Sequence, residues 1–248
     1  MRLTGKTAIV TGGASGFGAG IVRKFTSEGA RVMIADINHS AAQDLADQMG
    51  DHALACAVDV ADGASVSAMA RAAIEAWTHV DILVNNAGIT HLPQALEEVT
   101  EEDFDRVMAV NMKSVYLTAR ALVPHMKSRD AGCILNIAST AGVSPRPRLN
   151  WYNASKGWMI TATKAMAVEL APTGIRVNAL NPVAGETPLL KSFMGEDTPE
   201  MRAKFLATIP LGRFSTPQDM GNAACFLCSD EASMITGVAM EIDGGRCI

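Results

Sequence analysis

Three side chains in the second half of the chain have the chemistry for proton transfer at an oxygen atom. Tyr152 and Lys156 are four residues apart in a predicted helix over about 151–172, so they share one face. A cation beside a phenol favours the phenolate, so we expect Lys156 to lower the pKa of Tyr152 from about 10 toward the working range. Ser139 ends the apolar segment CILNIAS, where its hydroxyl can hold a substrate oxygen. Together the three predict general acid–base catalysis, whereas a Tyr–Lys pair alone is usually an inert surface feature.

A glycine-rich turn near the N-terminus gives the second chemical signal. The apolar run TAIV is followed by TGGASGFG, which ends at Gly18, and then by a predicted helix over about 17–28. Glycines in such a turn let backbone N–H groups approach a pyrophosphate at the helix N-terminus. A plain turn would explain one or two glycines, but the strand before and the helix after favour a dinucleotide site.

An acidic residue closes the next apolar segment, RVMIAD. Asp36 in this position can accept hydrogen bonds from ribose hydroxyls, and its charge would repel a 2′-phosphate. No Lys or Arg occupies the glycine turn or the positions 37–39. The sequence therefore predicts NAD(H) rather than NADP(H), although a helix N-cap would place an Asp here too.

The elements that must position these residues alternate along the chain. Seven short β-branched segments alternate with about six amphipathic stretches, including a long predicted helix over about 101–127. This order predicts an α/β fold, a single Rossmann-type domain over residues 1–248 with a doubly wound parallel sheet of about seven strands and helices on both faces. Ligands then bind at the carboxyl ends of the strands. The Pro- and Gly-containing stretch at about 185–213 breaks the rhythm, and we interpret it as a substrate loop over the cofactor site that is able to act as a lid.

Composition excludes several classes of function. The chain has 248 residues, 48% of them hydrophobic, and a net charge of -5, so it lacks the basic surplus that nucleic-acid binding needs. No apolar run approaches the roughly 20 residues that cross a bilayer, and no secretory signal is present, so we expect a cytoplasmic protein with no membrane partner. The five cysteines form no disulfide-like framework, and the Cys225–Cys228 pair lies in an apolar helical pattern typical of core thiols.

In order and spacing, the glycine turn, the segment NNAG at 85–88, Ser139 and the segment YNASK at 152–156 resemble the motifs of the short-chain dehydrogenase/reductase family. The resemblance covers essentially the whole chain. It implies a catalytic set of Asn111, Ser139, Tyr152 and Lys156, in which Asn111 helps to position a water that connects to the lysine, and it implies no metal at the reacting centre.

The resemblance also implies the cofactor contacts. Asp59 would lie on the adenine side, Lys156 would bind the nicotinamide ribose, and Thr187 would lie near the carboxamide, although Val183 replaces a glycine usual in the family. The full predicted cofactor set is Gly12, Ser15, Gly16, Phe17, Gly18, Asp36, Ile37, Asp59, Val60, Asn86, Ala87, Gly88, Tyr152, Lys156, Pro182 and Thr187.

The segment between Ser139 and Tyr152 is expected to form part of the substrate pocket. Arg146 and Arg148 lie there between prolines, and arginine can hold a carboxylate, phosphate or sulfonate in a bidentate manner. This favours an acidic substrate, although a solvated surface pair is the ordinary alternative. Three further residues are candidates for the pocket wall or, equally, for packing or surface positions: His91, Asn150 and Trp151.

We therefore predict an NAD(H)-dependent oxidoreductase that interconverts a secondary alcohol and its ketone or lactone by hydride transfer. The substrate classes are sugars, polyols and other hydroxy compounds, acidic ones included. The alternatives are a 3-oxoacyl-carrier-protein reductase-like ketoreductase, for which NADP would be expected, and a non-catalytic dinucleotide-sensing protein. The resemblance further implies a homotetramer, for which Val115, Leu122, Met159 and Ala167 are candidate interface residues.

Overall fold

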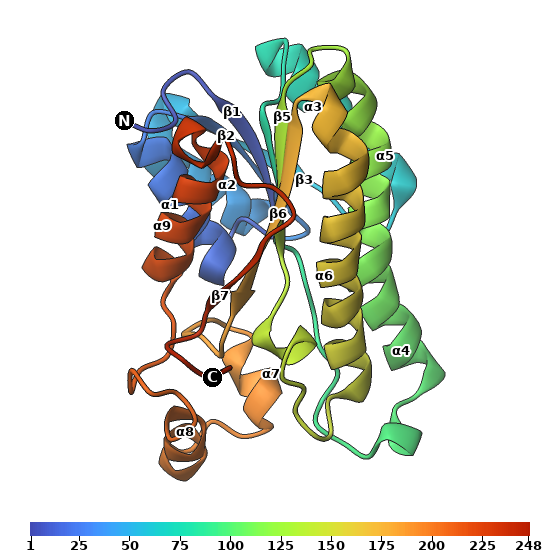
Figure 1. The fold of residues 1–248 in the computed structure, drawn as a ribbon, viewed down its shortest axis with the longest axis vertical. Helices are drawn as coiled ribbons and strands as arrows, with labels where there is room; N and C mark the ends of the chain where they lie inside the picture. Colours follow the sequence, from blue (N-terminus) through green and yellow to red (C-terminus); the bar gives the residue numbers. More distant parts are fainter.

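A seven-stranded, wholly parallel sheet runs through the middle of the molecule, and the computed structural model describes all 248 residues (Figure 1). The strand order is β3-β2-β1-β4-β5-β6-β7, so the order reverses between β1 and β4. Open sheets of this type bind ligands in the crevice at such a reversal. The strands are β1 (Thr7–Thr11), β2 (Arg31–Asp36), β3 (Ala53–Ala57), β4 (Ile82–Asn85), β5 (Gly132–Ile137), β6 (Ile175–Pro182) and β7 (Ala239–Ile242).

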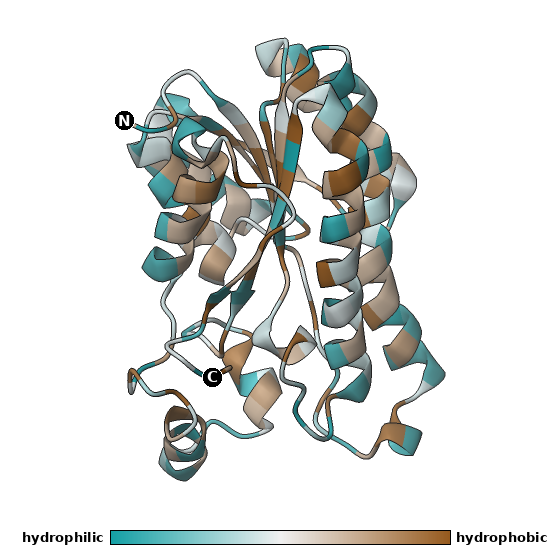
Figure 2. Cartoon of the chain, in the orientation of Figure 1, coloured by the Kyte–Doolittle hydropathy of each residue, from teal (hydrophilic) through white to brown (hydrophobic).

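Helices cover both faces of the sheet. One face packs against α1 (Gly16–Ser27), α2 (His39–Met49) and α9 (Pro217–Cys228), and the other against α3 (Gly63–Trp77), α5 (Ser114–Lys127) and α6 (Asn150–Leu170). Figure 2 shows hydrophobic residues concentrated in the strands and on the helix faces turned toward them. The predicted fold class, a doubly wound Rossmann-type sheet, is confirmed.

The long helix expected over 101–127 is not continuous. It consists of α4 (Glu101–Met108), a π-helical turn (Ala109–Lys113) and α5. The apolar periodicity did not reveal the π-helical turn, because α4 and α5 on either side continue one helical pattern. Such π-turns are often found at functional sites, and this one contains Asn111.

The stretch at 185–213 contains two short helices rather than loop alone, α7 (Leu190–Met194) and α8 (Pro199–Leu206). It has its own small hydrophobic core, in which Val183 packs against Leu190, Met194, Ile209 and Phe214. Figure 1 shows both helices below the carboxyl ends of the strands. This segment therefore lies on the side of the sheet where the chemical residues gather.

Some sequence expectations concern residues that fold into the core. The candidate interface residues Val115, Leu122, Met159 and Ala167 are all buried within one chain, so they are not available to a second subunit. Cys133, Cys225 and Cys228 are buried free thiols, as expected of core cysteines. None of the helices combines the length and the apolar character that crossing a bilayer would need.

Candidate active site

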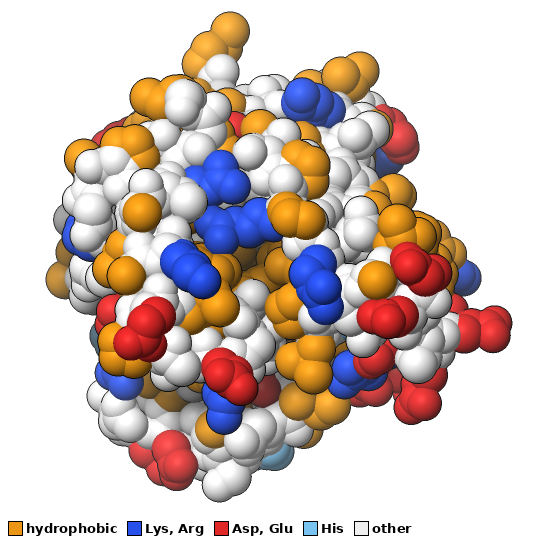
Figure 3. All heavy atoms as spheres, turned by 90° about the horizontal axis from the view of Figure 1, so that it is seen from below, with side chains coloured by type: hydrophobic (Ala, Val, Ile, Leu, Met, Phe, Trp, Pro, Cys, Tyr) orange, Lys and Arg blue, Asp and Glu red, His pale blue; other side chains and the backbone are white.

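A cavity of about 410 Å³ opens at the carboxyl ends of the strands, lined at one end by Asp36 and the glycine turn and at the other by Ser139, Tyr152 and Arg146. Figure 3 views this face of the molecule and shows it hollowed, with Lys and Arg side chains around the hollow. The nucleotide-like residues and the acid–base residues thus share one cavity, although they come from distant parts of the sequence.

The glycine turn is shaped by contacts that only glycine permits. Gly12 has φ +59°, and Asn86 Nδ2 donates to the carbonyl oxygens of Thr11 and Gly12 at 2.9 and 2.8 Å. A Cβ at Gly18 would lie 2.1 Å from the Gly12 carbonyl oxygen. The turn is therefore tied to the residues after β4, and Ser15, Gly16 and Phe17 at the start of α1 line the cavity, the position that a pyrophosphate site at a helix N-terminus requires.

Asp36 lies at the end of β2 with its carboxylate held by backbone groups. Its oxygens accept from Ala14 N at 3.0 Å and from Asn38 N at 2.9 Å. The N-cap of α2 is Asn38, whose side chain accepts from Ala41 N, so capping does not explain the Asp36 carboxylate. A fixed carboxylate at this edge is suited to accept hydrogen bonds from a ribose diol.

The residues predicted to transfer protons meet where β5 ends and α6 begins. Ser139 lies two residues beyond β5, and Tyr152 is in the first turn of α6; both are buried. Burial raises the pKa of Tyr152 to about 12, against an opposing hydrogen bond with the Ser139 hydroxyl. The Tyr152 pKa is therefore raised and not lowered as the sequence suggested, because desolvation of the phenolate outweighs the Ser139 hydrogen bond.

Lys156 is also buried, and its own titration is shifted. Its Nζ lies 5.9 Å from the centroid of the Tyr152 ring and donates to Ile137 O at 2.8 Å. Burial lowers its pKa to about 8 because the ammonium is removed from water. A lysine with this pKa exchanges its proton readily near neutral pH.

Asn111 lies behind Lys156 and is fixed on both sides. Its Oδ1 accepts from Ile89 N, and its Nδ2 donates to Ile89 O, each at 2.9 Å. Nδ2 also donates to Ser155 Oγ at 3.0 Å. Gly88 separates it from the lysine, since a Cβ at this glycine would lie 3.5 Å from Asn111 Oδ1 and 3.4 Å from Lys156 Nζ. The π-turn thus positions an amide next to the buried cation.

The structure brings most of the predicted site residues together. Fifteen of the sixteen predicted cofactor residues line the cavity, and the exception, Gly18, packs behind the turn. Asp59 lies beyond the end of β3 and is exposed, with Oδ1 accepting from Ala61 N. Of the catalytic set, Ser139, Tyr152 and Lys156 line the cavity, whereas Asn111 lies behind it.

The predicted substrate residues separate into two groups. Arg146 lines the cavity, but Arg148, His91, Asn150 and Trp151 do not. Arg148 is exposed and donates to Pro93 O at 3.5 Å. His91 is buried with Nδ1 against Leu92 O, and Trp151 packs edge-on against Phe104. Asn150, also exposed, begins α6.

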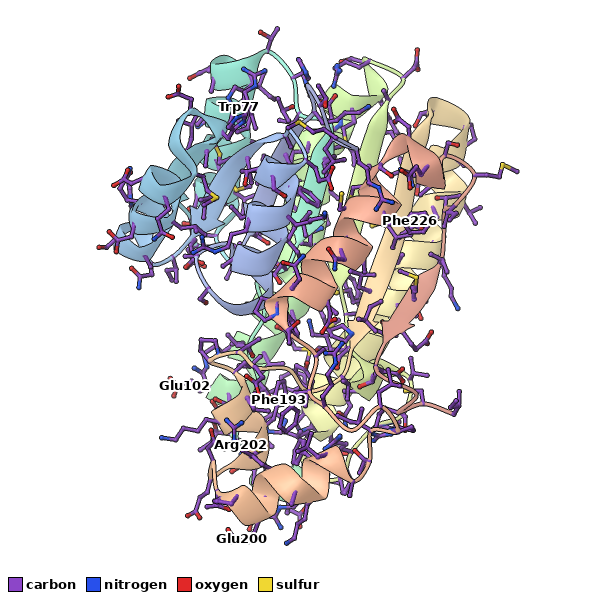
Figure 4. All side chains as sticks on the ribbon, turned by 90° about the vertical axis from the view of Figure 1, so that its left-hand side faces the viewer. Trp77, Glu102, Phe193, Glu200, Arg202 and Phe226 are labelled. Atoms are coloured by element: carbon purple, nitrogen blue, oxygen red, sulfur yellow. The ribbon has the colours of Figure 1, made fainter.

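Sequence reasoning missed the aromatic wall of the cavity. Phe193 of α7 packs edge-on against Tyr152 with the ring centroids 5.1 Å apart, and Figure 4 shows it on the side of the insertion that meets the rest of the molecule. Phe205 of α8 lies under the Arg146 guanidinium. No periodic pattern marks either residue, because the helices α7 and α8 are too short to show one.

Known proteins resemble the chain over its whole length. A family model described as Enoyl-(Acyl carrier protein) reductase matches residues 12–246. A 4-formylbenzenesulfonate dehydrogenase of Comamonas testosteroni is 49% identical over all of both chains. A 2-(R)-hydroxypropyl-CoM dehydrogenase of Xanthobacter autotrophicus is 38% identical, with 96% of this chain and 97% of that protein covered.

A solved structure gives the same picture. A 3-ketoacyl-(acyl-carrier-protein) reductase from Brucella melitensis, crystallised with NADH, is 52% identical, with a TM-score of 0.95 over 99% of this chain and 100% of that one. The sequence matches and the shared geometry agree: this chain is an oxidoreductase that acts on CH–OH groups and belongs to the short-chain dehydrogenase/reductase family.

Proposed function

We propose that the protein is an NAD(H)-dependent dehydrogenase that interconverts a secondary alcohol and its carbonyl compound. The observation that carries the proposal is the shared cavity, in which Ser139 and Tyr152 lie at one end and Asp36 and the glycine turn at the other. Hydride transfer needs the reacting carbon next to the nicotinamide and the oxygen next to an acid–base group. A single cavity with both kinds of residue supplies this proximity.

The residues of the nucleotide end fit NAD(H). The glycine turn lines the cavity where a pyrophosphate would bind, and the Asp36 carboxylate, held by two backbone N–H groups, lines the same end and would accept hydrogen bonds from the ribose hydroxyls. No Lys or Arg lines this end of the cavity to pair with a 2′-phosphate, which supports NAD over NADP. The 52% identical relative was crystallised with NADH, which also supports NAD(H) as the cofactor.

Bound nicotinamide would supply or accept the hydride, and the chain's own residues would handle the proton. The Tyr152 phenol holds its proton at neutral pH because its pKa is about 12, so it can donate that proton to a carbonyl oxygen during reduction. Ser139 would donate a hydrogen bond to the same oxygen. Lys156, with its pKa of about 8, would exchange protons beside the site, and Asn111 would hold the backbone that surrounds it.

A second candidate is a carrier-protein-dependent ketoreductase. The relative of known structure with 52% identity is described as a 3-ketoacyl-(acyl-carrier-protein) reductase. A carrier-protein substrate requires a basic docking surface, and this chain has more acidic than basic residues, 26 against 21. We therefore favour a small-molecule alcohol.

We also propose that the protein is a cytoplasmic homotetramer, as the family resemblance implies. Exposed apolar side chains on α5 and α6 support it, namely Tyr116, Trp158 and Val168. Large exposed apolar side chains on adjacent helices are suited to cover one another between subunits. Sedimentation of the purified protein measures the assembly directly.

The experiment is a cofactor and substrate panel. Purified protein is mixed with secondary alcohols, polyols and sugars and with NAD or NADP separately, and the absorbance of reduced nicotinamide is followed. We expect turnover with NAD at least about 10-fold faster than with NADP, which corresponds to about 1.4 kcal/mol of discrimination. A preference for NADP would contradict the role given to Asp36, and tight NADH binding without any turnover would favour a sensing protein.

A further inference from the structure

Two arginines from distant parts of the chain lie near one another, and one of them lines the reacting end of the cavity while the other lies outside its lining. Arg146 lines the cavity, with its guanidinium carbon 4.2 Å from the centroid of Phe205 and its Nη2 3.4 Å from Thr208 Oγ1. Arg246 comes from the C-terminal segment, and its Nη1 donates to Ser144 Oγ at 3.2 Å. The Arg246 Nε is buried and has no hydrogen-bond partner.

Neither guanidinium has a carboxylate to balance it. No salt bridge includes Arg146 or Arg246, whereas Arg202 of the insertion at 185–213 pairs with Asp197 and Glu186. Asp243 precedes Arg246 but accepts from the backbone N–H groups of Gly245 and Cys247 instead.

Partial burial and the neighbouring charge of Arg246 make the unpaired Arg146 guanidinium still less favourable. Burial, and after it the positive charge of Arg246, lowers the pKa of Arg146 to about 10. Two adjacent, partly desolvated cations without a counter-ion are unfavourable in the free protein. An anion that enters the cavity would remove that cost.

The wall between these arginines and the reacting hydroxyl groups is apolar. Phe193 contacts Tyr152 edge-on, Phe205 lies under Arg146, and Leu149 also lines the cavity. A ligand that reaches from Tyr152 to Arg146 therefore has to pass an aromatic and aliphatic surface, which favours a ring or short hydrocarbon body.

We propose that Arg146 and Arg246 together bind an anionic group of the substrate, a carboxylate, sulfonate or phosphate, at the far end of an apolar body from the reacting carbon. The proposal rests on the proposed function and specifies its substrate class. It replaces Arg148 by Arg246 as the second arginine of the site, because Arg148 points away to Pro93 O. Guanidinium pairs hold such anions through charge-assisted hydrogen bonds.

The first test compares matched substrates. The anionic probes are 4-(1-hydroxyethyl)benzenesulfonate and 4-(1-hydroxyethyl)benzoate, and the neutral probe is 1-phenylethanol. Each is assayed with NAD on the wild type and on the variants Arg146→Gln, Arg246→Gln and Arg148→Gln. We expect Arg146→Gln and Arg246→Gln each to raise KM for the anionic probes about 10- to 100-fold and to change KM for the neutral probe less than about 2-fold.

Arg148→Gln is the matched control and is expected to behave as the wild type, because Arg148 is exposed and donates to Pro93 O, whereas Arg246 lies close enough to Arg146 to shift its pKa. Equal effects on neutral and anionic probes, or an effect of Arg148→Gln equal to that of Arg146→Gln, would overturn the proposal.

A binding measurement keeps the site testable even without turnover. Titration calorimetry of benzenesulfonate, benzoate and phenyl phosphate into the protein, with and without NADH, identifies which anion is preferred. If the wild type binds one of them and Arg246→Gln loses that binding, the anion site stands even if no alcohol is oxidised, in which case the proposed function alone fails. If the wild type turns over the neutral alcohol but binds none of the three anions, the anion site fails and the proposed function stands.

Discussion

Replacing Lys156 by Met is expected to make the protein more stable and inactive at once. Burial shifts the pKa of this lysine from 10.5 to about 8, and at about 1.36 kcal/mol per pKa unit the buried ammonium costs up to ~3 kcal/mol of folding free energy at pH 7. Met fills a similar volume, but it loses the hydrogen bond to Ile137 O, worth about 1 kcal/mol. We therefore expect Lys156→Met to raise the free energy of unfolding by about 1–2 kcal/mol.

The pH dependence of this gain has a definite sign. Below pH 8 the lysine is protonated in both the folded and the unfolded protein, so the cost of the buried charge is present in full. Between pH 8 and pH 10.5 the folded protein has released the proton while the unfolded protein still holds it, so wild-type stability rises with pH. The advantage of Lys156→Met should therefore shrink over this range, disappear near pH 9–9.5 and become a deficit of about 1 kcal/mol near pH 10.5, where only the lost hydrogen bond remains.

Urea unfolding at pH 7 and pH 9.5, followed by circular dichroism, measures the effect, with activity assayed in parallel. Lys164→Met is the matched control because Lys164 is exposed on the same helix, α6; it is expected to change stability by less than about 0.5 kcal/mol. A Lys156→Met protein that is less stable than the wild type at pH 7, or whose advantage grows with pH, would refute the reasoning.

Three further predictions concern the cofactor end and the acid–base group. Asp36→Ala should lower the NAD-over-NADP ratio of kcat/KM at least about 10-fold, because the carboxylate that opposes a 2′-phosphate is gone; an unchanged ratio in steady-state assays contradicts this. Gly18→Ala should weaken NADH binding at least about 10-fold, measured by fluorescence titration, since its Cβ would lie 2.1 Å from Gly12 O and must displace the turn; Gly50→Ala, where no atom lies within 4 Å, is the control with unchanged binding. Alcohol oxidation should accelerate as pH rises from 7 to about 10 while carbonyl reduction stays nearly constant, because burial holds the Tyr152 pKa at about 12, so the phenol that reduction needs stays protonated while the phenolate that oxidation needs increases; an oxidation rate that does not change with pH would exclude Tyr152 as the titrating group.

The sheet and the main site residues could be predicted because each has a local signature. A buried parallel strand is a short apolar run, and residues at its carboxyl end fall at one edge of the sheet. Asp36 and Ser139 follow this rule, since they lie at or just beyond the ends of β2 and β5. The Tyr152–Lys156 spacing follows from one helical turn.

The pKa values of the site residues, the π-turn and the position of Arg246 could not be predicted from the sequence, because they depend on tertiary structure. Lys156 shares a face with Tyr152, but desolvation decides both pKa values, and the sequence does not show how deeply either group is buried. The π-turn around Asn111 has no compositional signal. Arg246 lies near the chain end, and no local pattern indicates that it contacts Ser144, about a hundred residues earlier in the chain.

Substitution of Tyr152 by Phe tests the central claim most directly. The change removes only the hydroxyl group and keeps the ring that packs against Phe193. In rapid-mixing experiments with saturating NAD and an alcohol that the wild type oxidises, we expect the rate of nicotinamide reduction to fall at least about 100-fold, with NADH affinity changed less than about 2-fold. A Tyr152→Phe protein that reduces the nicotinamide at the wild-type rate would contradict the account.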